Sequence, residues 1–349
     1  MKIKILGREK AVEKSMVRRP DPNSYVGFRV NKNMYNSRGV LVLPAQTVLT
    51  GKDIEMLLQQ NILLEEDDVE QVSIQNLVNA SIKEIKAVFE KVRNTNQIPF
   101  DFLRDRILPI IDDMSRHPHL KQILDHLERH DEYTYRHSIG VALISRFIGK
   151  AKGLHNEELQ ELTSAAFLHD IGKVKIPDEI LNKPGKLSDE EFAQVKKHTV
   201  YGYDMISQTS GIPPRQAKVA LQHHEREDGS GYPYGLKGDD IDPYSKMIAV
   251  ADVFHAMISK RVYKDAVPIF KVLREMSENA YGRLEPSTTL CFLKRIMETM
   301  IGNDVVLSNG SQGKIIMVKA DDPVHPLVEV KGTYIDLSKD HSVYLKSIV

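Results

Sequence analysis

Seven side chains of the kinds that bind metal ions recur through the middle of the chain. Eleven of the thirteen histidines lie between His117 and His255, although that span is less than half of the chain. Imidazole and carboxylate donors together suit Fe or Mn, with Zn, Ni or Co as alternatives, better than they suit ions that prefer thiolates. The seven are His137, His169, Asp170, His198, His223, His224 and Asp252. Their intervals each match one helix and a connection, so successive helices could present them to one bundle core around two divalent metal ions.

The adjacent pair His169-Asp170, followed by Ile171-Gly172-Lys173, is the strongest local signal. In such a pair the imidazole can bind one metal ion while the carboxylate bridges to a second. A single His-Asp pair is common, and a single histidine is more often a core or surface residue with satisfied hydrogen bonds. The regular spacing of all seven side chains favours a metal site over that simpler interpretation.

The double histidine is followed by a glycine-rich segment, Glu225-Arg226-Glu227-Asp228-Gly229-Ser230-Gly231-Tyr232-Pro233. Two glycines within three residues allow unusual dihedral angles and a close approach of the backbone to a ligand. Tyr232 offers an aromatic face beside the metals. Most glycine-rich loops are ordinary turns, but a position directly after the double histidine favours a role in the site.

Helices must position these side chains, because strand signals are almost absent between about 120 and 300. Asn156 is expected to cap a helix over 157–168, and Ser188 with Glu191 has the pattern of a capping box. Two more helices are expected over 215–224 and 248–260. The sequence therefore predicts an all-α domain over 121–300, preceded by a helical linker region over 71–120.

The segments on either side of this helical region have residue patterns that also indicate strands. Residues 1–70 indicate a small mixed module, with a strand over Val40–Leu43 and a helix that begins near Gly51. Residues 301–349 indicate a small β-rich region, because apolar runs flank Asn309-Gly310 as in a hairpin. The predicted fold class is mainly α, with a mixed α/β N-terminal module and a β-rich C-terminal cap.

Composition excludes some classes of function. The formal net charge is zero, which argues against binding of long nucleic acid, since that needs a basic surface. Cys291 is the single cysteine, so an internal disulfide is impossible, and a structural role is expected for it. No apolar run reaches the roughly 18 residues of a transmembrane segment, and no signal core is present at the start. We therefore expect a cytoplasmic protein, with its basic N-terminus a solvated tail.

The segment from about 131 to 290 resembles the HD-GYP family, a branch of the HD phosphohydrolase superfamily, and this implies an HD-type helical bundle. The resemblance covers somewhat under half of the chain. It rests on Phe167-Leu168-His169-Asp170-Ile171-Gly172-Lys173, Ile176-Pro177-Asp178, Lys183-Pro184-Gly185-Lys186-Leu187, His223-His224-Glu225, Asp228-Gly229-Ser230-Gly231-Tyr232-Pro233 and Ala249-Val250-Ala251-Asp252-Val253-Phe254, with Arg261 and Tyr263 closing the set.

The resemblance implies a role for each side chain. The first metal would be bound by His137, His169, Asp170 and Asp252, and the second by Asp170, His198, His223 and His224. Lys173 would contact the scissile phosphate, and the substrate would also be bound by Gly231, Tyr232, Arg261 and Lys264. The implied substrate is cyclic di-GMP, a bacterial second messenger, opened by a metal-bridging hydroxide to the linear dinucleotide, with GMP left open as an end product.

Three positions depart from the family pattern. Tyr133 stands where some members place a glutamate that supports a third metal, so two metals are expected. His255 stands where an acidic residue is usual; a partner behind the ligands or a surface residue is favoured over an additional ligand. Leu284-Glu285-Pro286 replaces Phe-Asp-Pro, which puts little of the chemistry in doubt.

Two alternatives remain open at this point. The domain could bind a cyclic dinucleotide with little or no turnover and signal through the N-terminal region, which could also contact a partner or a second copy. It could instead hydrolyse another cyclic dinucleotide. A degenerate sensor would be expected to have lost ligands, whereas every ligand type is present in this chain.

Overall fold

Buried apolar side chains gather in two separate cores, and the chain divides accordingly into the units Met1–Gln71 and Val72–Val349. The computed structural model describes residues 25, 28–47, 49, 51–71, 74–116, 120–127, 133–259, 267–278 and 282–349. None of the helices in these described parts combines the length and the apolar character that crossing a bilayer requires.

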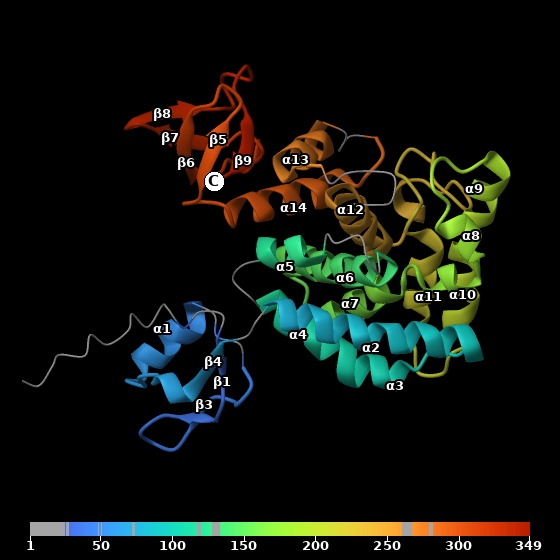
Figure 1. Ribbon diagram of the computed structural model, residues 1–349, viewed down its shortest axis with the longest axis horizontal. Helices are drawn as coiled ribbons and strands as arrows, with labels where there is room; N and C mark the ends of the chain where they lie inside the picture. Colours follow the sequence, from blue (N-terminus) through green and yellow to red (C-terminus); the bar gives the residue numbers. More distant parts are fainter. Residues whose placement is uncertain are drawn as a thin grey trace, which may run out of the picture. The chain divides into compact units, whose positions relative to one another are not determined.

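The N-terminal unit is a small mixed fold built from two antiparallel strand pairs and a helix (Figure 1). The helix α1 (Gly51–Gln59) contributes Ile54 and Leu57 to the core of this unit. A 3-10 turn over Glu66–Asp68 leads into the last strand. The strand pairs are β1 (Phe28–Val30) with β4 (Val69–Gln71), and β2 (Met34–Tyr35) with β3 (Leu41–Leu43).

The second unit begins with a helical bundle (Figure 1). Its longer helices are α2 (Ile74–Thr95), α4 (Leu108–Arg116), α5 (Leu120–Leu127), α6 (Tyr133–Ala151), α7 (Asn156–Leu168), α9 (Asp189–Lys196), α10 (His198–Ser207), α11 (Pro214–Gln222), α12 (Pro243–Ile258), α13 (Ile269–Glu278) and α14 (Pro286–Glu298). Short helical turns over Phe100–Phe102, Leu103–Ile107, Ile171–Lys175, Asp178–Leu181 and Gly238–Asp240 connect them.

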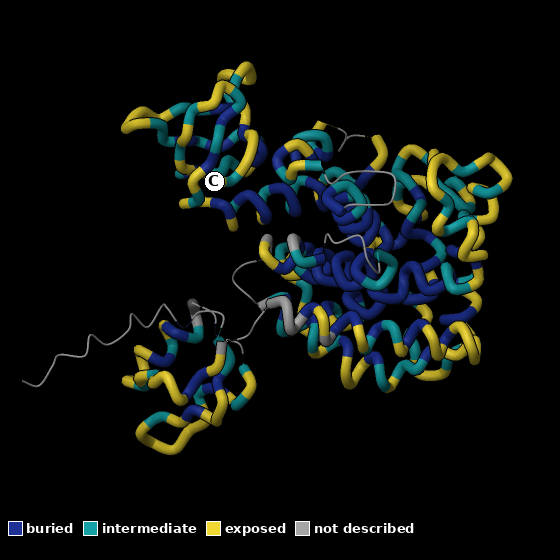
Figure 2. The backbone as a smooth tube through the Cα atoms, in the orientation of Figure 1, coloured by how far each residue is buried: buried dark blue, intermediate teal, exposed yellow. Residues whose placement is uncertain are grey.

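Helices α6, α7 and α12 form the centre of the bundle, and Figure 2 shows them as its most buried segments. Small residues let them pack closely: α6 carries Gly140 and Ala142, and α12 carries Ala249 and Ala251, all in the core region. Burial of apolar side chains on these helices gives the site a rigid support, because it restricts both backbone and side-chain freedom.

The chain ends in a five-stranded antiparallel sheet in the order β8-β7-β6-β5-β9. Val305, Leu307 and Ile315 from this sheet belong to the same apolar core as the bundle. Helix α13 contacts β9, and the Arg274 guanidinium lies 4.1 Å from the centre of the Tyr344 ring. The strands are β5 (Asp304–Leu307), β6 (Gln312–Met317), β7 (Leu327–Val330), β8 (Thr333–Asp336) and β9 (Leu345–Ile348).

The predicted fold class is confirmed: along the chain, a small mixed N-terminal module is followed by a helical bundle and then by a β-rich C-terminal region. The capping box of Ser188 and Glu191 is also confirmed. The expected cap at Asn156 is wrong by one residue, because His155 caps α7 and its backbone N–H donates to the Glu158 carboxylate at 2.8 Å. A carboxylate three residues into the helix satisfies that N–H whatever side chain precedes it.

Candidate metal centre

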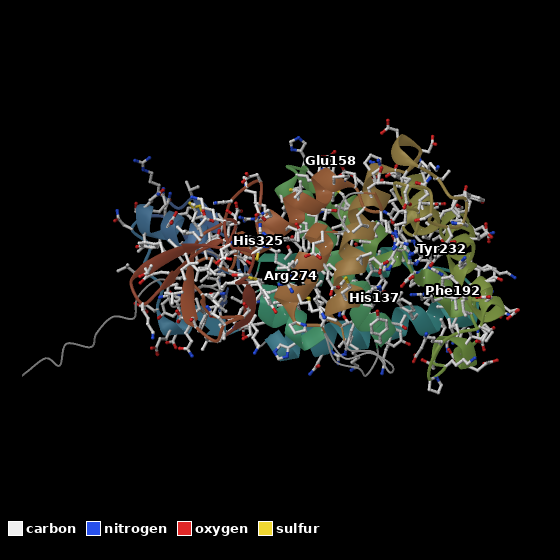
Figure 3. All side chains as sticks on the ribbon, turned by 90° about the horizontal axis from the view of Figure 1, so that it is seen from above. His137, Glu158, Phe192, Tyr232, Arg274 and His325 are labelled. Atoms are coloured by element: carbon white, nitrogen blue, oxygen red, sulfur yellow. The ribbon has the colours of Figure 1, made fainter. Side chains whose placement is uncertain are left out.

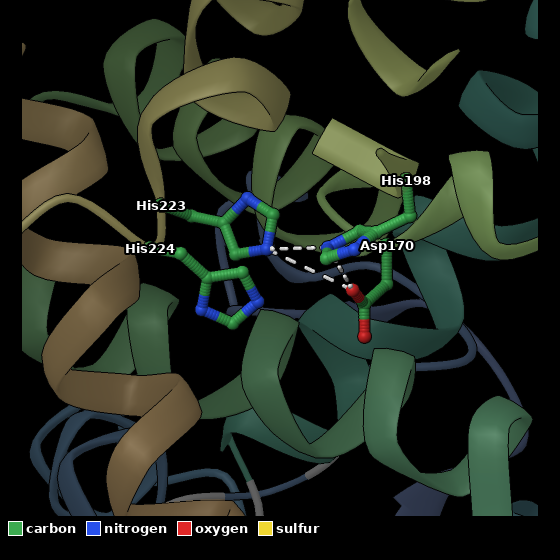
Figure 4. Close-up of side chains that lie close together, drawn as sticks. All are labelled: Asp170, His198, His223 and His224. Atoms are coloured by element: carbon green, nitrogen blue, oxygen red, sulfur yellow. Dashed lines mark hydrogen bonds and ion pairs between the residues drawn. The ribbon is translucent and has the colours of Figure 1, made fainter. Parts of the chain in front are cut away.

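The structure brings all seven predicted ligand side chains together in two adjoining groups. His137, His169 and Asp252 form one group, and Asp170, His198, His223 and His224 form the other; within each group one donor atom per residue lies within 4.8 Å of the others. Figure 4 shows the second group. All seven side chains are buried except that of His224, which is 17% exposed.

Asp170 lies between the two groups, and each of its carboxylate oxygens faces one of them. Oδ2 is 3.3 Å from Nε2 of His169 and 3.6 Å from Nε2 of His137. Oδ1 is 3.2 Å from Nε2 of His198 and 3.7 Å from Nε2 of His223 (Figure 4). One carboxylate can therefore serve both groups, which is the geometry of a bridging ligand.

Three imidazoles have their tautomers fixed by the backbone. In His169, His198 and His223 the Nδ1 atom lies 2.6, 2.7 and 2.9 Å from the carbonyl oxygen three residues earlier. A carbonyl oxygen only accepts, so Nδ1 carries the proton in each ring. Nε2 of each neutral ring is then a lone pair directed into the cluster, which is the form in which histidine binds a metal ion.

The donor atoms repel one another unless a cation lies among them. Nε2 of His198 and Nε2 of His223 are 3.3 Å apart, and both carry lone pairs. Among the described residues, neither Nε2 of His169 nor Oδ1 of Asp170 makes a hydrogen bond of good geometry, although both atoms are fully buried. Buried polar atoms without partners are costly. The donor set therefore fits divalent metal ions, which would satisfy these atoms together.

The two carboxylates of the cluster stay ionised. Burial raises the pKa of Asp170, but Lys173 and His169 outweigh it and hold that pKa well below its usual range. Burial likewise raises the pKa of Asp252, but the nearby His137 and the other imidazoles outweigh it and hold that pKa well below the usual range. Two negative charges are thus available to bind cations at neutral pH.

Burial keeps three of the imidazoles neutral. Burial lowers the pKa of His223 to about 4. Burial and the neighbouring His223 ring together lower the pKa of His224 well below its usual value. Burial also lowers the pKa of His137, although Asp252 opposes it. His169 differs, because the nearby Asp170 carboxylate outweighs burial and raises its pKa. Neutral imidazoles are the protonation state that metal binding requires.

His255 is a buried partner of a predicted ligand, so the interpretation as a surface residue is wrong. Its Nδ1 lies 3.0 Å from Nδ1 of His137 and 3.2 Å from Oγ of Ser259. If His255 Nδ1 accepts from both, His137 is protonated at Nδ1 and its Nε2 lone pair faces Asp252 and Asp170. A partner of this kind orients a metal ligand.

Two further residues shape the surroundings of His137: Gly140, which no motif singled out, and Tyr133, whose contact with the ring the sequence did not show. A Cβ atom on Gly140 would lie 2.0 Å from Nε2 of His255, so only glycine leaves room for that ring. Tyr133 stacks on His137 with the ring centres 5.3 Å apart, and its hydroxyl is 3.4 Å from Nδ1. The position of the family's extra glutamate is therefore filled by an aromatic ring.

Lys173, the predicted phosphate contact, lies at the edge of the cluster. Its ammonium is 2.5 Å from Oδ2 of Asp170, and the side chain is 22% exposed. The two other predicted cationic contacts, Arg261 and Lys264, lie outside the described residues.

The loop after the double histidine is held by a buried carboxylate. Glu225 accepts hydrogen bonds from the backbone N–H groups of Tyr234 at 2.8 Å and Leu236 at 2.9 Å. Gly231 passes so close to this segment that a Cβ atom there would be 2.4 Å from Cα of Glu225. The Tyr232 ring consequently packs on His224, with the centres 4.6 Å apart.

The segment Leu284-Glu285-Pro286, which departs from the family pattern, has a structural role. Its Glu285 carboxylate caps the start of α14.

Comparisons with known proteins agree with this geometry. Residues 118–287 match the HD domain family. A cyclic di-GMP phosphodiesterase of Pseudomonas aeruginosa is 34% identical over 246 residues, which is 70% of this chain and 59% of that protein. A cyclic di-GMP phosphodiesterase of Thermotoga maritima is 43% identical over 181 residues, 50% of this chain and 49% of that protein.

A 3'3'-cGAMP-specific phosphodiesterase of Vibrio cholerae is 39% identical over 161 residues, 46% of this chain and 31% of that protein. The chain thus spans less than two thirds of the length of each of these relatives. The matched region contains every one of the seven clustered side chains. Residues 118–287 of the helical bundle form an HD domain, and the chain belongs to the HD-GYP family.

Proposed function

We propose that this chain is a phosphodiesterase that uses two divalent metal ions to open cyclic di-GMP to the linear dinucleotide. The observation that carries the proposal is the position of Asp170, whose two oxygens face two separate groups of buried imidazole and carboxylate donors. Two cations on either side of one carboxylate are the arrangement used for in-line displacement at phosphorus.

The names of the relatives support the substrate class. Proteins named as cyclic di-GMP phosphodiesterases match this chain at 34% identity over 246 residues and at 43% identity over 181 residues. The loop that carries Gly231 and Tyr232 is present beside the cluster, with the Tyr232 ring over His224. We propose that Gly231, Tyr232, Arg261 and Lys264 contact the substrate.

Each part of the site has a defined task in this proposal. His137, His169 and Asp252 would hold one ion, and His198, His223 and His224 would hold the other, with Asp170 shared. Bound divalent ions supply a water of lowered pKa and compensate negative charge on a phosphoryl group. Lys173 keeps Asp170 ionised and offers its remaining N–H donors to the scissile phosphate at the edge of the site.

We propose two ions rather than three, and Fe or Mn as their identity. The Tyr133 ring stacks on His137 where a third site would need a carboxylate. The donors are imidazole nitrogens and carboxylate oxygens, which suit these ions, with Zn, Ni or Co as alternatives. Counting metals per chain by elemental analysis tests the number, and a count clearly above two would contradict it.

A second candidate substrate is another cyclic dinucleotide. The relative from Vibrio cholerae that is named as specific for 3'3'-cGAMP favours this alternative. Parallel assays with cyclic di-GMP and 3'3'-cGAMP distinguish the two, since the preferred substrate gives the higher kcat/KM.

The deciding experiment follows linear product from cyclic di-GMP after incubation with Mn²⁺ or Fe²⁺. Wild-type protein should produce the linear dinucleotide, and Asp170→Asn should not, because it loses the shared carboxylate. The exposed Asp239 provides a matched control, so Asp239→Asn should behave as the wild type. Absence of product from the wild type with either metal would overturn the enzymatic proposal and favour a binding module.

We further propose that the N-terminal module, residues 1–70, contributes a signalling input or a contact with a partner or a second copy. It has a core of its own, formed by Tyr25, Val30, Met34, Leu43, Leu49, Ile54, Leu57 and Val69. A unit with a separate core can respond to a signal without rearranging the bundle. Comparing the oligomeric state of the full chain with that of an Ile54→Asp variant tests this contribution.

A further inference from the structure

A lysine and two aromatic rings form a small cluster beside the metal centre. The Lys196 ammonium lies 4.7 Å from the centre of the Phe192 ring and 5.4 Å from that of Tyr232. The centres of the two rings are 6.2 Å apart and their planes meet at 81°. The ammonium therefore contacts two aromatic rings that are nearly perpendicular to one another. Figure 3 shows Phe192 and Tyr232 next to one another.

Both sides of this cluster are held in place by their own elements. Phe192 and Lys196 are four residues apart on α9 and so share one face of the helix. The start of α9 is fixed by the Ser188 cap, and the Glu191 carboxylate pairs with Lys183 at 2.6 Å. The Tyr232 side is fixed by the loop bound to Glu225. The cluster is therefore a preformed feature rather than three independent surface residues.

The cluster adjoins the predicted metal ligands. The Tyr232 ring centre is 4.6 Å from that of His224 and 6.5 Å from that of His198. Helix α9 ends at Lys196, two residues before His198. A ligand that reaches the metal centre and extends beyond it on the Tyr232 side would meet Lys196 and Phe192 next.

Lys196 is suited to bind an anion. No carboxylate among the described residues pairs with it, whereas the other lysine of the site, Lys173, is 2.5 Å from Asp170. Contact with aromatic faces holds an ammonium in position but consumes none of its N–H donors in a hydrogen bond to oxygen. Phe192 is 44% exposed, so one part of its ring is covered by the lysine and another part remains open.

We propose that Lys196, Phe192 and Tyr232 form a subsite for the second nucleotide of a cyclic dinucleotide, a proposal that rests on the function proposed above. The Lys196 ammonium donates to the phosphate that is not cleaved, and the exposed face of Phe192 stacks against a base. This subsite distinguishes a cyclic dinucleotide from simple phosphodiesters.

The chemistry of the substrate supports this assignment. A cyclic dinucleotide carries two phosphates, and the metal centre with Lys173 neutralises only the one that is cleaved. The second charge is brought into the same confined site, and a cation close to it reduces the cost of removing it from water. A base can add a stacking contact with an aromatic ring, which is tolerant of base identity. Phe192 and Lys196 supply these two contacts from adjacent turns of one helix.

The test compares Lys196→Gln with Lys197→Gln, a neighbouring exposed lysine outside the cluster. The selectivity is the ratio of kcat/KM for cyclic di-GMP to kcat/KM for bis(4-nitrophenyl) phosphate, a diester with one phosphate. Loss of a charge-assisted contact should lower this ratio about tenfold in Lys196→Gln, mainly through KM for cyclic di-GMP. Lys197→Gln should keep the wild-type ratio. An unchanged ratio in Lys196→Gln would overturn the role of the ammonium.

Phe192 is tested by Phe192→Ala and its conservative partner Phe192→Tyr. Loss of the stacking face should raise KM for cyclic di-GMP about tenfold in Phe192→Ala, and Phe192→Tyr should restore it. Equal KM values in all three proteins would refute the base contact. If the wild type hydrolyses the nitrophenyl diester but not cyclic di-GMP, the proposed function fails; if it hydrolyses both and the variants do not differ, only the subsite fails.

Discussion

Replacement of His255 by leucine should weaken metal binding although His255 is not a predicted ligand. The Nδ1 atom of His255 lies 3.0 Å from Nδ1 of His137, and both rings are buried. Leucine removes the acceptor but keeps an apolar side chain against Gly140. The His137 ring then loses the partner that holds its proton on Nδ1 and directs Nε2 toward Asp252, 3.1 Å away.

The expected magnitude follows from the kind of contact that is lost. A partner that orients a metal-binding histidine changes metal affinity by about 10- to 100-fold, which is about 1.4 to 2.8 kcal/mol. The Tyr133 hydroxyl, 3.4 Å from the same nitrogen, can replace part of the lost contact. We therefore expect about tenfold weaker binding in His255→Leu, and a larger loss when Tyr133→Phe is added.

Competition with a chromogenic chelator measures the dissociation constant for Mn²⁺ in each variant. Ser259→Ala is the matched control, because it removes only the second hydrogen bond to His255 Nδ1, at 3.2 Å, and leaves the His137 contact intact. Thermal unfolding of the metal-free proteins separates a local effect from a general loss of stability. An unchanged dissociation constant in His255→Leu with Tyr133→Phe would refute the assignment of the His137 tautomer.

Three further predictions follow from the cluster. Asp170→Asn should reduce bound metal measured by elemental analysis, since both groups share that carboxylate; full loading would contradict its bridging position. Gly140→Ala should destabilise the protein by about 1 to 3 kcal/mol in urea unfolding, because its Cβ would lie 2.0 Å from Nε2 of His255. Burial lowers the pKa of His223 to about 4, so the folded metal-free protein binds fewer protons than the unfolded chain between about pH 4 and 6.5, and its stability should fall as pH falls through that window. The expected loss from His223 is about 3 kcal/mol, and an equally steep fall in His223→Asn would contradict it.

The sequence predicted the mainly α fold because apolar residues recur at helical spacing along 120–300, and it predicted the flanking modules because that spacing changes there. The position of a helix end was less certain. His155 rather than Asn156 caps α7, since the backbone N–H of the capping residue pairs with Glu158. A side-chain pattern does not show which backbone N–H a carboxylate will reach.

The seven clustered side chains could be identified from residue type and interval, and the structure brings them together. The contacts that surround those side chains could not be identified from the sequence. His255 and His137 are 118 residues apart, and their contact depends on how α12 packs on α6. In the sequence near His137, the sign of that packing is Gly140, because the absence of a side chain there leaves room for the His255 ring. Lys196 and Tyr232 are likewise brought together only by the fold.

The location of each histidine along its helix explains why His255 is needed at all. His169 and His223 directly follow α7 and α11, and His198 follows the last residues of α9. Carbonyl groups in the last turn of a helix have no intrahelical N–H partner, so they can accept from Nδ1 and set the tautomer. His137 lies inside α6, where carbonyl groups are already paired along the helix. Its Nδ1 needs a side-chain acceptor instead, and His255 of α12, at 3.0 Å, lies closer to it than the Tyr133 hydroxyl of α6, at 3.4 Å. Removal of that acceptor should therefore affect His137 without disturbing the other three rings.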